Sequence, residues 1–184
     1  KDTVVDKKIN YLNSIASLYR KNENYTALLN IVKASYGINP KPTNRDIYDL
    51  GEAAYLASNY PFADSIFTVY KTKYPNEKFG YYWRARVAQA ADTTMEKGLL
   101  VKPVEEYIQF LEKDKEKNKN ALIQQYSLLA AYYANVVKDK AKAIANLQKI
   151  LEYDPENADA KKYIDILNKP VKPNNPKPKA KPKK

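Results

Sequence analysis

Side chains that could act as catalysts are scarce in this chain of 184 residues, which has no His and no Cys. This composition excludes a Ser-His-Asp triad, a Cys nucleophile with a His base, a Cys/His zinc site and the usual ligands of haem or iron–sulfur clusters. The carboxylate pairs Glu105–Glu106 and Glu156–Asp159 converge with no other reactive group, and the four Gly residues form no phosphate-binding loop. We therefore predict that the protein is not an enzyme and uses no metal or cofactor.

The net charge of +11 is unevenly distributed along the chain. Residues 169–184 read KPVKPNNPKPKAKPKK, with seven Lys, five Pro and no acidic residue, which leaves +4 for residues 1–168. Like charge and Pro prevent such a segment from building a core, so we predict a folded domain over 1–168 and a disordered Lys/Pro-rich tail over 169–184. The tail provides an alternative function, binding of a polyanion such as nucleic acid, anionic lipid or a cell-wall polymer. Because the body is nearly balanced in charge, nucleic acid is the less favoured partner.

The body shows the apolar spacing of helices almost throughout and no sustained strand alternation, so the predicted fold class is all-α. Pro and Asn residues fall between the apolar stripes, and Thr43 followed by Asp46 resembles a capping box. The charged run 112–119 is expected to be a solvated linker or helix end, and the uncharged run 120–137 a buried helix and not a membrane span. The predicted helices are 3–21, 24–36, 44–58, 61–73, 77–91, 97–113, 119–137, 140–153 and 157–168.

Two stretches repeat the same pattern of large and small residues. One runs Ile47, Leu50, Gly51, Ala54, Ala63, Phe67, Tyr70, Pro75, and the other runs Tyr126, Leu129, Ala130, Tyr133, Ala143, Leu147, Ile150, Pro155. The pattern resembles that of tetratricopeptide repeat (TPR) proteins, and weaker copies with Tyr11, Ile15 and Leu18, and with Tyr81 and Ala85, extend it over about residues 8–168. The third copy departs from the pattern at Arg84, where the family has Leu. The resemblance implies a right-handed α-solenoid of about four helix pairs, closed by a capping helix over 157–168 with Tyr163, Ile164 and Leu167 on its apolar side.

The resemblance also implies where a partner would bind, because the first helices of TPR pairs line a concave groove. The predicted groove residues are Arg45, Tyr48, Glu52, Tyr55, Tyr82, Arg86 and Gln89, followed by Ser127, Ala131 and Asn135 in the last pair. Tyr and Arg concentrate binding energy in protein interfaces. The implied function is a scaffold or adaptor that holds a peptide or partner helix. Exposed Tyr and charges on a solvated face are the alternative interpretation.

TPR domains that grip the C-terminal carboxylate of chaperones carry cations at fixed groove positions. The matching positions here hold Leu12, Ala16, Asp49, Phe79 and Trp83, so we predict no chaperone binding of this type. The segment 91–98 lengthens the third repeat and is either a functional loop or an ordinary surface loop after a longer helix. This part of the chain, with the richness in Asn, Lys and Tyr, is similar to TPR proteins of Gram-negative cell envelopes. The similarity implies a periplasmic or cell-envelope location, with the cytoplasm as the alternative.

Overall fold

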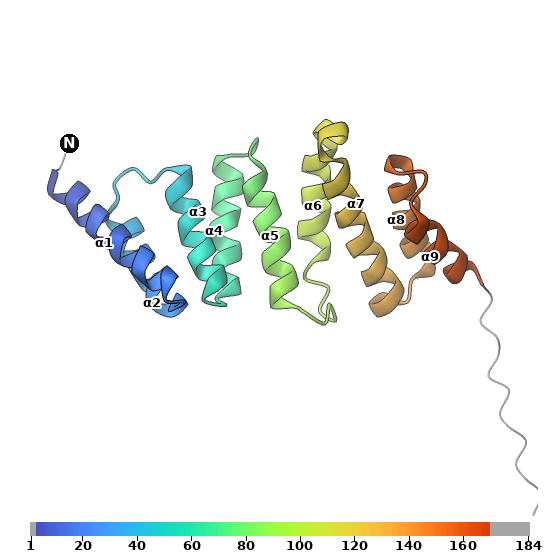
Figure 1. Cartoon of the computed structure of the whole chain (residues 1–184), viewed down its shortest axis with the longest axis horizontal. Coiled ribbons are helices and arrows are strands. Elements are labelled where there is room, and N and C mark those ends of the chain that lie inside the picture. Colours follow the sequence, from blue (N-terminus) through green and yellow to red (C-terminus); the bar gives the residue numbers. More distant parts are fainter. Residues whose placement is uncertain (1–2, 170–184) are drawn as a thin grey trace, which may run out of the picture.

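The computed structural model describes residues 3–169, and this part of the chain is built from consecutive helices without strands. Figure 1 shows them side by side in a single row that follows the order of the sequence. The α-helices are α1 (Thr3–Lys21), α2 (Tyr25–Ile38), α3 (Asn44–Leu56), α4 (Tyr60–Lys73), α5 (Lys78–Ala91), α6 (Val101–Leu111), α7 (Lys115–Tyr132), α8 (Lys140–Tyr153) and α9 (Ala158–Asn168). A 3-10 turn (Glu112–Asp114) precedes α7, and a π-helical turn (Tyr133–Val137) follows it. The all-α prediction is confirmed.

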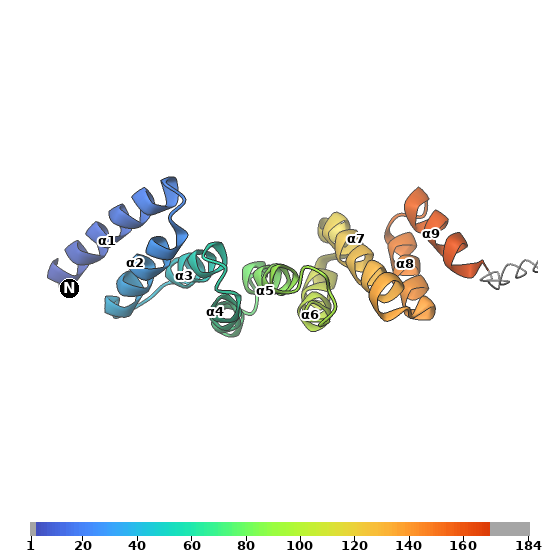
Figure 2. The ribbon, with the colours of Figure 1, turned by 90° about the horizontal axis from the view of Figure 1, so that it is seen from below.

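Each helix in this region packs on the helices next to it along the chain. Figure 2 shows the odd-numbered helices on one side of the row and the even-numbered helices on the other, with both ends of the row bent toward the odd-numbered side. The odd-numbered helices therefore line the concave side of the array. This stacking of helix pairs is the TPR-like solenoid architecture that the repeat pattern predicts.

The small residues of the pattern lie where helices approach closely. A Cβ atom added to Gly51 in α3 would lie 2.6 Å from the ring of Phe67 in α4, and Phe67 is fully buried. Ala63, Ala85 and Ala143 are also buried at helix contacts. The close approach of α3 and α4 thus depends on a residue without a side chain.

The hydrophobic core of residues 3–169 consists of two clusters that meet at α5. Trp83 and Val87 belong to the cluster under α1–α4, whereas Ala85 and Ala88 belong to the cluster under α6–α9. Two opposite sides of one helix therefore hold the halves of the array together. Most Tyr residues between 3 and 169 are buried or half-buried.

Several helix ends follow from local hydrogen bonds. The predicted capping box at Thr43 and Asp46 is confirmed, with both reciprocal hydrogen bonds present. The run 112–119 is mostly exposed and forms a helix end, as expected, but α7 begins at Lys115, four residues earlier than predicted, because Asp114 caps it through a hydrogen bond from Lys117 N. Glu112 accepts hydrogen bonds from the hydroxyls of Tyr126 and Tyr153 and so is tied to α7 and α8.

The two end helices are more exposed than their apolar patterns predict. Tyr11 and Leu18 in α1 are 72% and 61% exposed, because α1 has a packing neighbour on one side only and contacts it through Ala16 and Tyr19. The helix α9 covers the last pair, as predicted for a capping helix, with Ala160 fully buried. Its Tyr163, however, is 51% exposed and does not lie in the core.

The longer third repeat contains a folded loop between α5 and α6. Asp92 is 5% exposed and accepts hydrogen bonds from the backbone N–H groups of Lys97 (2.9 Å) and Leu99 (3.4 Å). This loop delays α6 until Val101, four residues later than predicted, and α5 is not lengthened. The predicted tail over 169–184 lies outside the described residues apart from Lys169.

Candidate partner-binding groove

The seven residues predicted to form the groove all lie on α3 and α5, two of the helices that line the concave side. Arg45 and Arg86 are exposed, and the other five are half-buried. The structure divides them into two groups. One surrounds Trp83 on α5, and the other borders the space between α1 and α3.

The central group is an Arg clasped by two Tyr hydroxyls. Arg86 donates from Nη1 to the hydroxyl of Tyr82 (2.8 Å) and from Nε to that of Tyr55 (3.4 Å). Its guanidinium also lies over the rings of Tyr55 (5.5 Å) and Trp83 (5.3 Å). The hydrogen bonds that Arg86 donates to Tyr55 and Tyr82 raise its pKa, so the side chain carries its charge at any physiological pH. We call Tyr55, Tyr82, Trp83 and Arg86 the aromatic–Arg cluster.

The cluster is held in place by aromatic packing beneath it. Trp83 is 8% exposed and stacks on Phe67, with ring centroids 5.3 Å apart and an interplanar angle of 5°. Tyr48 contacts Trp83 and Phe67 by ring edges, and burial raises the pKa of its hydroxyl. Side chains that are already fixed by such packing lose less conformational entropy when a ligand binds.

A hollow of about 240 Å³ opens beside the cluster, between α5, α6 and α7. Tyr82, Arg86 and Gln89 line it from α5, Tyr107 from α6 and Gln125 from α7. Gln89 turns back to donate to the carbonyl of Ala85 (3.2 Å). The Oε1 atom of Gln125 is buried and accepts no hydrogen bond from any residue between 3 and 169. One residue that lines the hollow thus has a side-chain oxygen without a hydrogen-bond donor.

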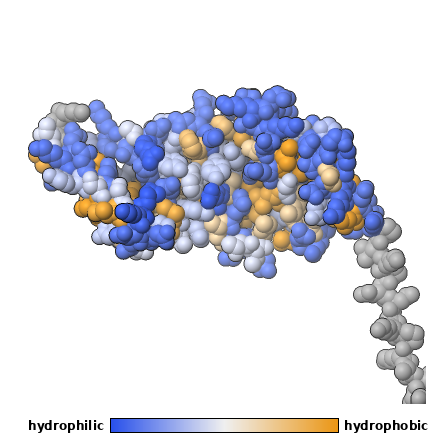
Figure 3. All heavy atoms as spheres, in the orientation of Figure 1, coloured by the Kyte–Doolittle hydropathy of each residue, from blue (hydrophilic) through white to orange (hydrophobic). Residues whose placement is uncertain are grey.

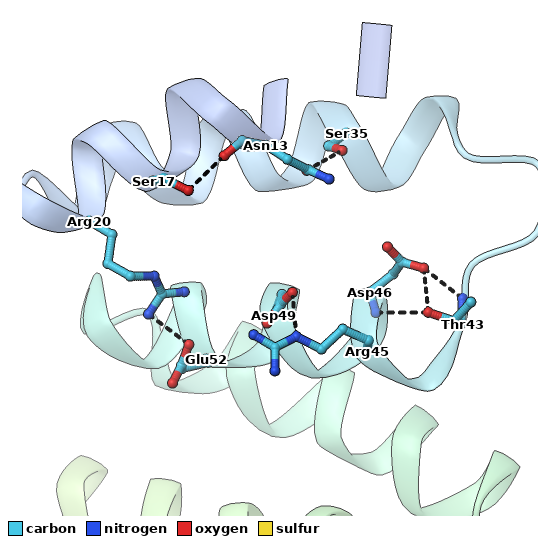
Figure 4. A network of polar contacts seen from close by, with 9 residues as sticks. All are labelled: Asn13, Ser17, Arg20, Ser35, Thr43, Arg45, Asp46, Asp49 and Glu52. Carbon is cyan, nitrogen blue, oxygen red and sulfur yellow. Dashed lines mark hydrogen bonds and ion pairs between the residues drawn. The ribbon is translucent and has the colours of Figure 1, made fainter. Parts of the chain in front are cut away.

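The second group borders a polar cleft of about 200 Å³ between α1, α2 and α3. Figure 4 shows the side chains of α1 and α3 facing one another across it. Arg20 of α1 forms an ion pair with Glu52 of α3 (2.7 Å), and Ser35 of α2 donates to Asn13 of α1 (3.0 Å). The Arg20–Glu52 pair joins two helices that otherwise contact each other little. We call this space the α1/α3 cleft.

Asp49 is a carboxylate of the α1/α3 cleft with one buried oxygen. Its Oδ2 accepts a hydrogen bond from Nε of Arg45 at 2.9 Å, while its Oδ1 is buried without a donor among residues 3–169. Burial raises the pKa of Asp49, and the hydrogen bond and charge of Arg45 offset only part of this effect. The Arg45 side chain is 75% exposed, and an exposed pair at i,i+4 contributes only about 0.3–0.5 kcal/mol.

The last predicted groove residues, Ser127, Ala131 and Asn135, line a different hollow, of about 440 Å³, between α7, α8 and α9. Its walls are mostly apolar and include Leu147, Tyr163 and Ile166. Figure 3 shows orange, apolar atoms gathered over the half of this face where α6, α7 and α8 lie. We call this space the α7/α9 hollow.

Sequence reasoning missed an ion-pair network beside the groove. Arg84, which departs from the repeat pattern, is only 13% exposed and pairs with Asp64 of α4 (2.9 Å) and Glu106 of α6 (2.6 Å). Lys71 also pairs with Glu106 (2.8 Å). Burial alone would raise the pKa of Glu106, but the hydrogen bond from Lys71 and the charge of Arg84 lower it. The one signal in the sequence was the Arg at a position where a Leu was expected.

The positions of a carboxylate clamp hold no cation in this structure. Asp49 faces the α1/α3 cleft, and Trp83 is buried under the groove. Between residues 3 and 169, no cluster of three or more His, Cys, Asp or Glu side chains is placed to ligate a metal ion. Over the same residues, no helix combines the length and apolar character that crossing a membrane requires.

The fold and the repeat pattern together define the class: the chain is a TPR-type helical-repeat protein. A solved structure supports this directly. The chain is similar to the C-terminal part of a TPR repeat-containing protein from Cytophaga hutchinsonii, with 30% sequence identity and a TM-score of 0.71. The alignment covers 85% of this chain and 60% of the solved one, so the chain spans less than two thirds of that structure. No family model and no curated protein sequence matches the chain.

Proposed function

We propose that the protein is a non-enzymatic interaction module that holds a peptide or a partner helix along its concave side. The carrying observation is the aromatic–Arg cluster, in which a fixed guanidinium and two Tyr side chains lie next to an open hollow. Residues of these types dominate the energetics of protein interfaces. TPR-type folds suggest protein partners in general, and the position of the cluster supports a contact with α3 and α5.

A quantitative capture experiment tests the proposal. A partner isolated from source-cell extract with the wild-type chain should bind Tyr82→Ala or Arg86→Ala at least about tenfold more weakly, as expected for interface hot spots. Tyr11→Ala and Lys73→Ala are matched controls, because both side chains are exposed and line none of the three hollows. Full retention of the partner by both groove variants would refute the assignment of the groove.

We further propose a periplasmic or cell-envelope location over a cytoplasmic one. The support is the similarity of segment 91–98 and its surroundings to TPR proteins of Gram-negative cell envelopes. Fractionation of cells that express the full gene product at its native level, followed by immunoblotting of periplasmic, membrane and cytoplasmic fractions, tests this location. A signal confined to the cytoplasmic fraction would contradict it.

A further inference from the structure

The α1/α3 cleft contains an anion that the protein itself satisfies poorly. Asp49 accepts one hydrogen bond at Oδ2, and its buried Oδ1 has no donor among the residues from 3 to 169. A buried acceptor without a donor costs free energy, and a charged acceptor costs more than a neutral one. A ligand that supplies donors to this carboxylate would recover that cost.

The cation now paired with Asp49 is largely exposed. Arg45 contacts the carboxylate through a single nitrogen, Nε, its guanidinium lies over the ring of Tyr48 (5.5 Å), and three quarters of its side chain is exposed. Its two terminal nitrogens face no hydrogen-bond partner in the described part of the chain. The pairing nevertheless shows that a guanidinium fits against this carboxylate, and that the Arg45 side chain can leave without uncovering a core.

The remaining charges of the cleft favour a cation. When Arg45 swings out, the nearby ionised groups are the carboxylates of Asp46, Asp49 and Glu52 and the guanidinium of Arg20. Arg20 is committed to Glu52, and Asp46 to the N-cap of α3, so Asp49 is the acceptor left open. The cleft holds about 200 Å³, lined by the polar side chains of Asn13, Ser17 and Ser35, which is room for a guanidinium or ammonium group.

We propose that the α1/α3 cleft binds a Lys ammonium or Arg guanidinium of the partner, which takes the place of Arg45 at Asp49 and beside the ring of Tyr48. A partial rotation of the carboxylate about χ2, whose profile is broad for Asp, turns both oxygens toward the incoming donors. A bidentate charge-assisted pair is stronger than the single bond it replaces. This proposal rests on the proposed function and names the chemistry of one end of the partner.

The hollow beside the aromatic–Arg cluster points the same way. Gln125 Oε1 is the second buried side-chain acceptor without a donor between residues 3 and 169, and it also lines a hollow of the concave side. Both unmet acceptors thus belong to residues that line spaces on the concave side. Donors of a partner would reach them once the two side chains rotate.

The test uses small probes and the full chain labelled with 15N. N-acetyl-lysine methylamide and N-acetyl-arginine methylamide are titrated at low ionic strength, with N-acetyl-norleucine methylamide as the uncharged control of matching stem. We expect saturable shifts of the backbone amides of Asn13, Ser17 and Asp49 with both cations, with dissociation constants on the order of millimolar for such small ligands, and none with the norleucine probe. No shift at probe concentrations of about 100 mM, or equal shifts with the norleucine probe, would overturn the proposal.

Two variants with opposite expected signs exclude a general loss of folding. Asp49→Asn should weaken binding of both cationic probes at least about tenfold, whereas Arg45→Gln should strengthen it several-fold, because the competing cation is gone. Asp165→Asn, an exposed carboxylate on α9, is the charge-matched control and should change nothing. Undiminished binding by Asp49→Asn would refute the site even if the Tyr82 and Arg86 variants lose the partner. Conversely, if the Tyr82 and Arg86 variants keep the partner, the proposed groove is refuted, but binding of the cationic probes at Asp49 is not.

Discussion

The α1/α3 cleft and the α7/α9 hollow occupy equivalent places in the array, each between consecutive odd-numbered helices, yet their walls differ in chemistry. The first is polar and crossed by an ion pair, and the second is larger and mostly apolar. Glu52, Arg86 and Ala131 follow directly after the small residue of their repeats and illustrate the difference. Equivalent positions of successive repeats thus carry a carboxylate, a guanidinium and a methyl group along one groove.

This difference teaches that the repeat sets where a contact can be made, whereas single side chains set what it recognises. An extended or helical partner would meet a site for a cation at one end, an Arg held by Tyr in the middle and an apolar hollow at the other. Such a gradient would fix the direction in which the partner lies, because the reversed orientation places apolar groups against charges.

The largest expected effect on stability comes from truncating a buried side chain beneath the α7/α9 hollow. Leu147→Ala deletes a 6% exposed side chain under the α7/α9 hollow and should cost about 2–5 kcal/mol of unfolding free energy, measured by urea denaturation. Because each repeat contacts only its neighbours, hydrogen exchange should quicken in α7–α9 and stay slow in α3 and α4. Uniform loss of protection along the chain would show that the two ends are not energetically separable.

A smaller loss of stability is expected when the ion pair across the α1/α3 cleft is removed. Glu52→Gln removes the ion pair that joins α1 to α3 and should cost about 0.2–1 kcal/mol, less at high salt. A double-mutant cycle with Arg20→Gln isolates the pair energy, and hydrogen exchange should report faster opening of α1. A coupling energy of zero would mean that α1 is held by its packing on α2 alone.

Ala131→Glu transfers the residue type of α3 to α7 and sharpens the comparison. Because position 131 is exposed, the folded state should change by no more than about 0.5 kcal/mol in thermal unfolding. The apolar hollow should then bind an apolar dye more weakly than in the wild type. Unchanged dye fluorescence would indicate that the hollow is not the apolar surface of this end.

The smallest effect is the pH dependence of Asp49. The pKa of Asp49 is raised in the folded protein, so the folded state binds its proton more tightly, and this group destabilises the fold as pH rises through the interval between the unfolded and folded pKa values. Asp49→Asn should therefore be neutral or stabilising by less than about 0.5 kcal/mol at pH 7, and the advantage should shrink as the pH falls below that interval. Urea titrations of both proteins at pH 7 and in acid measure it. A growing advantage at low pH would reverse the sign.

Local chemistry explains why much of the fold could be predicted from sequence. The spacing of Gly51 and Phe67 predicts a close helix contact, and Thr43 with Asp46 predicts a helix start, because both depend on residues near one another along the chain. The resemblance to TPR proteins assigns the aromatic–Arg residues Tyr55, Tyr82 and Arg86 to one face. The structure places these three together.

Properties that depend on distant residues could not be predicted. The burial of Arg84 requires Asp64 and Glu106, which lie 20 and 22 residues away in sequence and on two other helices. Likewise, α1 has apolar residues on two sides. Its sequence alone does not predict which side packs on α2, and the side with Tyr11 and Leu18 is the exposed one. The unmet acceptors on Asp49 and Gln125 are visible only in three dimensions.

The division of the core at α5 has a mechanical consequence. Because Trp83 and Val87 anchor this helix to one cluster and Ala85 and Ala88 to the other, we expect α5 to transmit any motion of one half of the described array to the other. Tyr82 packs against both clusters, and Arg86 lies on the same helix. A ligand bound there would contact both halves of the array at once. Its binding would therefore restrict the motion of one half relative to the other.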